Sequence, residues 1–209
     1  AMQGPSFSPE MQDLRRLAAG RSPCQSRGMT APHLTTKADF LAWLGEKGIA
    51  HETRDHPPLH TVEEAEAHRA SWPPHEREGA FCKNLFLKDK KGRLFLIVTL
   101  EARDLKLNRL AKPIGSARLS FGNPDLLFEV LGVRPGSVTP FALVNDREGR
   151  VTVVLDAPML EHGRLHYHPL ENTATTGLAR EDFLRLLRET GHEPLILDLV
   201  EAASAAEAG

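Results

Sequence analysis

The chain has 209 residues, 41% of them hydrophobic and 26% charged, and a formal net charge of −2 with neutral histidines. This composition supports one domain with a hydrophobic core and a terminal tail, and the slightly negative charge argues against a sequence-specific or duplex-coating DNA-binding protein. No apolar run approaches the ~20 residues that cross a membrane, and the first residues lack the blocks of a secretion signal. Two cysteines, Cys24 and Cys82, favour a reducing cytoplasm over a disulfide-forming compartment.

Composition divides the chain into three parts. Residues 1–33 mix Ser, Gly, Pro, Arg and Gln without a sustained apolar period, which predicts a weakly ordered extension. Residues 34–200 should form the folded domain. Residues 201–209 are a low-complexity tail that we expect to fray beyond Leu199.

The first half of the domain carries clear helix caps and a hairpin. A helix should begin at Thr36 and stop at Gly48, and Thr61 with Glu64 forms a capping box for a second helix. A first strand is expected over residues 49–54. Alternating apolar residues around the Gly-containing turn at 89–92 predict an antiparallel hairpin of two further strands, residues 80–88 and 94–100.

The second half interleaves helices and strands. Asn123 and Pro124 begin a helix that should end at Gly132, because Asn caps helices and Pro suits their first position. The other expected helices are 105–112 and 180–190, and the expected strands are 118–121, 139–145, 150–155, 164–168, 173–176 and 194–199. Tight turns between several strands require antiparallel pairs, so the predicted fold class is α+β.

Lys83 is the residue least explained by folding alone. On an extended strand it shares a face with Phe81, Leu85 and Leu87, and burying an unpaired ammonium among apolar groups is costly. Lys83 therefore either points into a cleft that receives a polar ligand or extends to water at the rim of the sheet.

A small loop follows the helix that ends at Gly132. Its residues are Gly136, Ser137, Val138, Thr139 and Pro140. Glycine allows a ligand to approach the backbone closely and proline fixes the end of the loop, so the loop could present peptide groups to a substrate. An ordinary connection between two elements is the alternative.

Two histidines lie two residues apart on a predicted strand. His166 and His168 could hold a metal, but no Cys, Asp or Glu stands at a clear partner spacing. We therefore expect neither a metal nor a cofactor, and a His168 that binds substrate or fills a structural hydrogen bond.

Positive charge is concentrated in one segment. Residues 83–118 contain ten Lys or Arg against three acidic residues, so this segment carries +7 and the remainder −9. Within it, Arg103, Lys106, Arg109 and Lys112 recur every third residue on a predicted helix. Such a stripe is either a solvated helix face or a surface for a phosphate backbone.

Four stretches in register resemble the YbaK/ProX family of prolyl-tRNA editing domains. They are residues 56–64 (HPPLHTVEE), 82–87 (CKNLFL), 131–146 (LGVRPGSVTPFALVND) and 168–176 (HPLENTATT). The similarity covers residues 35–199, and the Lys-Asn pair and His-Pro-Leu stretch are closer to the freestanding ProX branch than to the cysteine-directed YbaK branch.

The resemblance implies a mixed, partly barrelled sheet flanked by helices and a deacylase acting on mischarged proline tRNA, alanine first. It assigns the essential lysine to Lys83, the substrate-orienting loop to Gly136–Pro140, and polar pocket positions to Asn84, His168 and Thr61. It also implies that a ribose hydroxyl of the tRNA assists the attacking water, and that prolyl-tRNA synthetase is a possible partner.

Two other functions compete with this hypothesis. One is a non-catalytic tRNA- or DNA-binding or regulatory protein that keeps the fold and binds through its basic stripe. The other is a metal-dependent hydrolase that uses His166 and His168. The chain shows no phosphate-binding loop, serine elbow or dinucleotide fingerprint, so any hydrolysis would rely on positioning rather than on an evident nucleophile.

Overall fold

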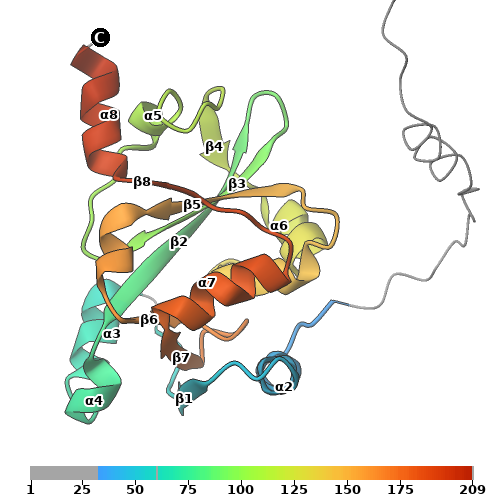
Figure 1. Cartoon of the computed structure of the whole chain (residues 1–209), viewed down its shortest axis with the longest axis vertical. Coiled ribbons are helices and arrows are strands. Elements are labelled where there is room, and N and C mark those ends of the chain that lie inside the picture. Colours follow the sequence, from blue (N-terminus) through green and yellow to red (C-terminus); the bar gives the residue numbers. More distant parts are fainter. Residues whose placement is uncertain (1–32, 60, 209) are drawn as a thin grey trace, which may run out of the picture. The chain divides into compact units, whose positions relative to one another are not determined.

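The computed structural model describes residues 33–59 and 61–208 (Figure 1). The extension expected over residues 1–33 therefore lies, except for His33, outside the described residues, as does Cys24. Within the described ranges no helix is both long enough and apolar enough to span a bilayer.

An eight-stranded mixed sheet forms the centre of the domain. Its path is β1-β7-β6-β2-β3-β5-β8, and β4 pairs with β2 beside this path. The pairs β2–β6, β3–β5 and β5–β8 are parallel and the others antiparallel, which confirms the α+β class. The strands are β1 His51–Asp55, β2 Ala80–Asp89, β3 Leu94–Leu100, β4 Leu119–Phe121, β5 Val151–Asp156, β6 Arg164–Tyr167, β7 Ala174–Ala179 and β8 Leu195–Leu197.

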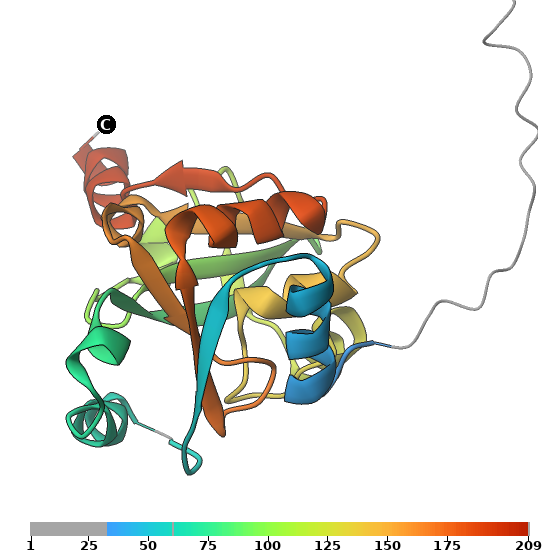
Figure 2. The same ribbon diagram turned by 60° about the horizontal axis from the view of Figure 1, so that its bottom comes forward.

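Helices flank this sheet, and Figure 2 shows α2 and α7 on one side of it. The α-helices are α2 Lys37–Glu46, α3 Val62–Arg69, α4 Pro74–Arg77, α5 Leu107–Leu110, α6 Pro124–Leu131, α7 Arg180–Glu189 and α8 Leu199–Ala208. Two short 3-10 helices, η1 Pro140–Asn145 and η2 Ala157–Glu161, complete the described elements.

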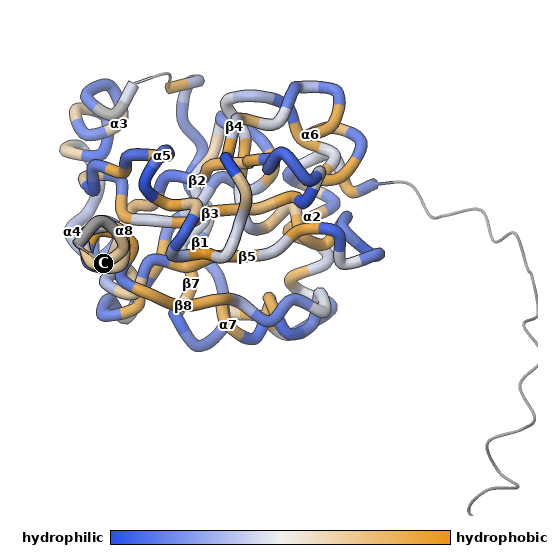
Figure 3. The backbone as a smooth tube through the Cα atoms, turned by 90° about the horizontal axis from the view of Figure 1, so that it is seen from above, coloured by the Kyte–Doolittle hydropathy of each residue, from blue (hydrophilic) through white to orange (hydrophobic). Residues whose placement is uncertain are grey.

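The two faces of β3 belong to two hydrophobic cores. Leu96 and Val98 pack into the larger core with residues of α2, α6 and α7, whereas Phe95 and Ile97 pack into a smaller core with residues of α5 and α8. Alternation of side chains along a strand produces this division. The continuous apolar run of β3 is thus buried on both sides, and β3 is among the hydrophobic segments in Figure 3.

The predicted caps are confirmed. The hydroxyls of Thr36 and Thr61 accept hydrogen bonds from backbone N–H groups three residues on, both at 3.1 Å. The side chain of Asn123 caps α6 in the same way at 2.7 Å. Gly132 ends α6 in the left-handed conformation, with φ 68°, which glycine adopts without steric strain.

Two sequence-based elements are wrong. The strand expected over residues 139–145 is the 3-10 helix η1, because the Thr139 hydroxyl caps the N–H of Phe141 and Pro140 lacks the N–H that a sheet ladder requires. The helix expected over residues 105–112 is only the single turn α5, since the backbone at Lys106 is still extended.

The expected fraying beyond Leu199 is also wrong, because residues 199–208 form α8. Leu199 is fully buried and Ala203 is nearly so, both in the smaller core. The carboxylate of Asp198 accepts the N–H groups of Val200 and Glu201 at 2.9 and 3.0 Å, which satisfies the start of the helix. Alanine favours helix, and the packing of Leu199 and Ala203 in the smaller core stabilises α8 further.

Asp89 stabilises the β2–β3 turn in a pH-dependent manner. Its carboxylate accepts the N–H groups of Lys91, Arg93 and Ala117 at 2.8 to 3.1 Å and the Arg93 guanidinium at 2.9 Å. Burial acts to raise the pKa of Asp89, but these bonds outweigh it and lower the pKa to about 2. A lowered pKa adds stability that is present above the ordinary value and is lost as pH falls through the folded one.

We therefore expect Asp89→Asn to lower the unfolding midpoint at pH 7. The difference from the parent protein should shrink as pH falls from about 4 towards 2, because the parent carboxylate becomes protonated over that range. Urea unfolding at several pH values measures this. A difference that stays constant down to pH 2 would show that the charge of Asp89 is not what stabilises the turn.

Candidate active site

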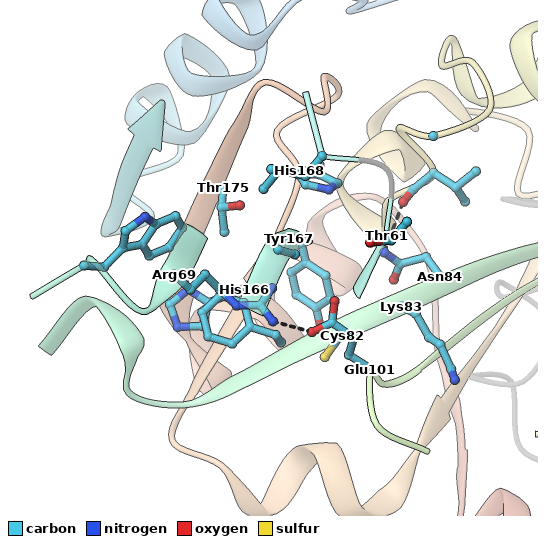
Figure 4. Close-up of a pocket in the computed structure, with 16 residues that line it drawn as sticks. Thr61, Arg69, Cys82, Lys83, Asn84, Glu101, His166, Tyr167, His168 and Thr175 are labelled. Carbon is cyan, nitrogen blue, oxygen red and sulfur yellow. Dashed lines mark hydrogen bonds and ion pairs between the residues drawn. The ribbon is translucent and has the colours of Figure 1, made fainter. Parts of the chain in front are cut away.

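A pocket of about 270 Å³ opens beside the N-terminal half of β2 (Figure 4). Its walls come from α3 and the residues just after it, β2, the end of β3, the loop before η1, and β6 and β7. Six of the residues expected to contact substrate line it: Thr61, Lys83, Asn84, Gly136, Val138 and His168. Folding therefore brings together segments that are far apart in the chain.

The other predicted loop residues lie behind this wall. Ser137 is half-buried, and Thr139 and Pro140 are buried at the start of η1. They support the loop rather than line the pocket. Gly136 has φ 90°, a conformation that strains any residue with a Cβ, so glycine is required at the point where the loop meets the pocket.

Asn84 links strand β2 to this loop. Its side-chain Nδ2 donates to the carbonyl of Val138 at 3.0 Å, which fixes the orientation of the amide. The remaining oxygen, Oδ1, is buried and has no hydrogen-bond partner among the described residues. Leaving a buried acceptor unmatched costs free energy, so this oxygen is available to accept a hydrogen bond from an N–H or O–H group in the pocket.

Lys83 lies at the edge of the pocket and is half-buried. Its neighbours on the same face, Leu85 and Leu87, belong to the smaller core, as the alternation predicted. The ammonium donates a hydrogen bond to the backbone carbonyl of Arg103, and Figure 4 shows the side chain directed away from His168. The ammonium thus has a protein partner rather than bulk solvent alone.

His168 follows β6 and is held by one ring nitrogen. Its Nδ1 lies 2.8 Å from the carbonyl of Ala174, so Nδ1 carries the proton. Burial lowers the pKa of His168, against the opposing effect of that hydrogen bond, and the nearby His56 and Arg69 lower it further. The neutral ring leaves Nε2 as a hydrogen-bond acceptor for a water molecule or substrate.

His166 is held differently. Its Nε2 donates to the carbonyl of Glu78 at 2.7 Å, and its ring stacks on Phe81 with 4.3 Å between centroids. Burial also lowers the pKa of His166. The two histidines are therefore bound to separate carbonyls, and in the described ranges no group of three or more His, Cys, Asp or Glu is arranged to hold a metal ion.

Sequence reasoning missed one polar wall of the pocket. Arg69 of α3 forms an ion pair with Glu101 at 2.6 Å, and its guanidinium lies 4.1 Å from the ring centre of Phe81. The pair ties α3 to the end of β3. No local signal marks these residues, because a charged residue on a helix and one after a strand are common on protein surfaces.

The floor of the pocket includes Tyr167 and Cys82. Burial raises the pKa of the Cys82 thiol to about 12, so the thiol stays protonated near neutral pH. A thiolate is the nucleophilic form of cysteine, and Cys82 is therefore not suited to nucleophilic attack. Burial likewise raises the pKa of Tyr167.

The predicted basic stripe is not a helical face. Arg103 precedes α5, and its guanidinium binds the carboxylates of Asp156 and Asp198. Lys112 donates to the carbonyl of Ala206 in α8 at 2.9 Å. The three-residue spacing suggested a stripe only because a longer helix was expected.

The fold and the pocket define a class of protein. It is an α+β domain with a polar pocket beside β2, lined by Lys83 and Asn84 of that strand and by the loop that contains Gly136. The chain belongs to the aminoacyl-tRNA editing domain family, whose model matches residues 56–186.

Similar proteins agree with this family. The chain is 42% identical over 168 residues to prolyl-tRNA synthetase associated domain-containing protein 1 of Xenopus laevis, covering 77% of this chain and 95% of the relative. It is 33% identical over 160 residues to prolyl-tRNA editing protein ProX of Acetoanaerobium sticklandii, covering 76% and 94%. A solved structure described as a candidate trans-editing enzyme for prolyl tRNA synthetase shares the fold, with a TM-score of 0.59, 20% identity, and coverage of 79% and 98%.

Proposed function

We propose that this protein hydrolyses the ester bond of mischarged proline tRNA, with alanine as the preferred amino acid. The observation that carries the proposal is the convergence of Lys83, Asn84, Gly136 and His168 on one pocket, with the Asn84 amide tying the strand to the loop. These are the residues that the family resemblance assigns to the site. The names of the relatives support proline tRNA as the substrate.

The reaction needs little activation by the protein. An aminoacyl ester is already reactive, so orienting it towards water and stabilising the developing oxyanion are sufficient. Water forms a bond to the carbonyl carbon, the bond to the ribose oxygen breaks, and that oxygen takes a proton. In this proposal Lys83 holds the terminal nucleotide, the loop at Gly136 orients the aminoacyl group, and Asn84 Oδ1 accepts a hydrogen bond from it. A ribose hydroxyl of the tRNA assists the water.

The selection of alanine follows from size. A synthetase site shaped for proline cannot reject a smaller amino acid by steric exclusion, because a missing methylene is worth only ~1–3 kcal/mol. A second pocket that is too small for proline supplies the missing discrimination. The Phe81, Tyr167 and Trp72 side chains, together with the Arg69–Glu101 pair, supply rigid walls for such a pocket.

The tRNA backbone would meet the cations around α5. Lys106, Arg109 and Lys112 remain the proposed contacts, and double-stranded RNA is recognised mainly through its backbone and shape. Arg103 is removed from this group because two carboxylates already hold its guanidinium. Prolyl-tRNA synthetase is a further proposed partner, since it produces the mischarged substrate.

Deacylation of a panel of charged tRNAs tests the proposal. Ala-, Ser- and Cys-tRNA(Pro) are compared with correctly charged Pro-tRNA(Pro), each with and without a chelator. We expect rapid release of alanine, little release of proline and no effect of the chelator. Binding of these tRNAs without turnover would instead support a non-catalytic RNA-binding protein, and loss of activity with the chelator would support a metal-dependent hydrolase.

His168 should contribute through its free Nε2 acceptor. We expect His168→Ala to lower kcat/KM about 10- to 100-fold, the range that corresponds to losing one buried hydrogen bond. In the parent protein, activity should fall on the acid side only below about pH 6.5, the ordinary histidine value, because the folded pKa is lowered and protonation removes the acceptor. This acid limb should be absent from the pH profile of the variant.

His75→Ala is the matched control, because that side chain is 69% exposed. It should retain the parent rate and pH profile. An acid limb that persists unchanged in His168→Ala would assign the titration to another group.

A further inference from the structure

The ammonium of Lys83 is anchored by a backbone carbonyl that is itself held in place. Lys83 Nζ donates to the carbonyl of Arg103, in the turn between β3 and α5. The side chain of the same arginine points to two carboxylates: Nε lies 3.0 Å from Asp156, and Nη2 binds Asp198. One residue thus connects the pocket lysine to two acidic groups on other elements.

Both carboxylates are fixed by further hydrogen bonds. Asp156, at the end of β5, is fully buried and accepts the hydroxyl of Thr99 at 2.6 Å and the N–H of Leu199 at 3.0 Å. Asp198 accepts the N–H of Val200 in the first turn of α8 at 2.9 Å. The arginine therefore bridges β5 and the start of α8, two rigid elements outside the pocket.

We infer that Arg103 is a positioning residue for Lys83, which extends the proposed function of the pocket and rests on it. A lysine side chain has a flexible four-carbon stem, and a hydrogen bond to a fixed carbonyl restricts that stem before substrate arrives. Two of the three ammonium N–H groups then remain for the substrate. The Arg103 carbonyl lies in the turn after β3, and the ion pairs of the Arg103 side chain with Asp156 and Asp198 fix that turn.

This role differs from direct contact with RNA. A phosphate would have to displace two carboxylates from the guanidinium, one of them on a fully buried residue. The Arg103 side chain is only 23% exposed, so little of it faces a ligand in solution. The charge of Arg103 pairs with Asp156 and Asp198 inside the protein. Arg103 therefore affects the substrate only indirectly, by positioning Lys83.

Single-turnover deacylation in a double-mutant cycle tests the inference. We expect Arg103→Ala and Asp198→Asn each to lower the rate about 10- to 100-fold, a range typical of a misplaced catalytic group, with little change in tRNA binding. Arg103→Lys should fall between Arg103→Ala and the parent, because lysine cannot bridge both carboxylates. In the Lys83→Ala background, Arg103→Ala should cause no additional loss, because coupled residues are not additive.

A second measurement does not depend on turnover. Labelling of Lys83 by an amine-directed acylating reagent, followed by peptide mass spectrometry, should be several-fold faster in Asp198→Asn, since the ammonium is released from its carbonyl. Lys88, exposed on the same strand, is the internal reference. Asp198→Asn keeps the Arg103–Asp156 pair. It can therefore be used to test the inference if Arg103→Ala does not fold.

Arg150→Ala is the matched control, since it removes a partly exposed arginine that pairs with Glu129 at 2.7 Å away from this network. It should change neither rate nor labelling. Additive loss in the Lys83→Ala background together with weaker tRNA binding would overturn the inference and make Arg103 an RNA contact. Unchanged labelling of Lys83 would overturn it as well. An inactive parent protein would end the proposed function, while the labelling would still decide whether Arg103 positions Lys83.

Discussion

Replacing Lys83 by alanine should reduce kcat/KM for Ala-tRNA(Pro) by about 10²- to 10³-fold, the loss typical of removing one preorganised stabilising group. The side chain stands at the pocket edge, and its ammonium is oriented by the Arg103 carbonyl. In the proposed function, alanine removes the cation assigned to hold the terminal nucleotide against the loop at Gly136. Steady-state and single-turnover deacylation with purified mischarged tRNA measure the effect.

Lys88→Ala is the matched control on the same strand, because Lys88 is exposed. Its deacylation rate and the unfolding midpoints of both variants should match the parent protein. Substantial activity in Lys83→Ala would remove this lysine from the mechanism, and a large loss in Lys88→Ala would mean that general charge, rather than the position of Lys83, drives catalysis.

Phe141→Ala should lower the free energy of unfolding by about 3–5 kcal/mol, the usual cost of truncating a buried phenylalanine. Phe141 is fully buried in η1, directly after the pocket loop. Its ring stacks on Phe40 at 4.7 Å and meets Tyr167 edge-on at 5.2 Å. Since the total stability of a domain is only about 5–15 kcal/mol, this loss is a large fraction of it.

Phe121→Ala is the control for this effect, because that side chain is 64% exposed on β4. Its change in stability should stay within about 0.5 kcal/mol, as is usual for surface positions. Urea unfolding of both variants makes the comparison. Equal losses in the two variants would contradict the assignment of Phe141 to the core that supports the loop.

Local chemistry made the helix caps and the hairpin predictable. Thr36, Thr61 and Asn123 cap helices through hydrogen bonds to groups three residues away, and Gly132 ends α6 because its backbone conformation suits glycine. These interactions lie within one short segment, so the sequence contains everything that they need. The two errors had different causes. At residues 139–145 the Thr139 cap and the missing N–H of Pro140 favour a 3-10 helix over a strand. Beyond Leu199 the low complexity of the segment concealed the helix preference of alanine, and the packing of Leu199 and Ala203 in the smaller core is a long-range contact.

By itself, the sequence determined the α+β class, the caps, the apolar faces of the central strands and the residues that resemble an editing domain. Only the tertiary structure decided that Lys83 and Asn84 share a pocket with His168, that Arg69 pairs with Glu101, and that Arg103 binds Asp156 and Asp198 instead of facing solvent. The partner of a charged group is set by long-range contacts between separate elements. Spacing along the chain does not show those contacts. The sequence therefore shows the number of basic residues but not the partner of each one.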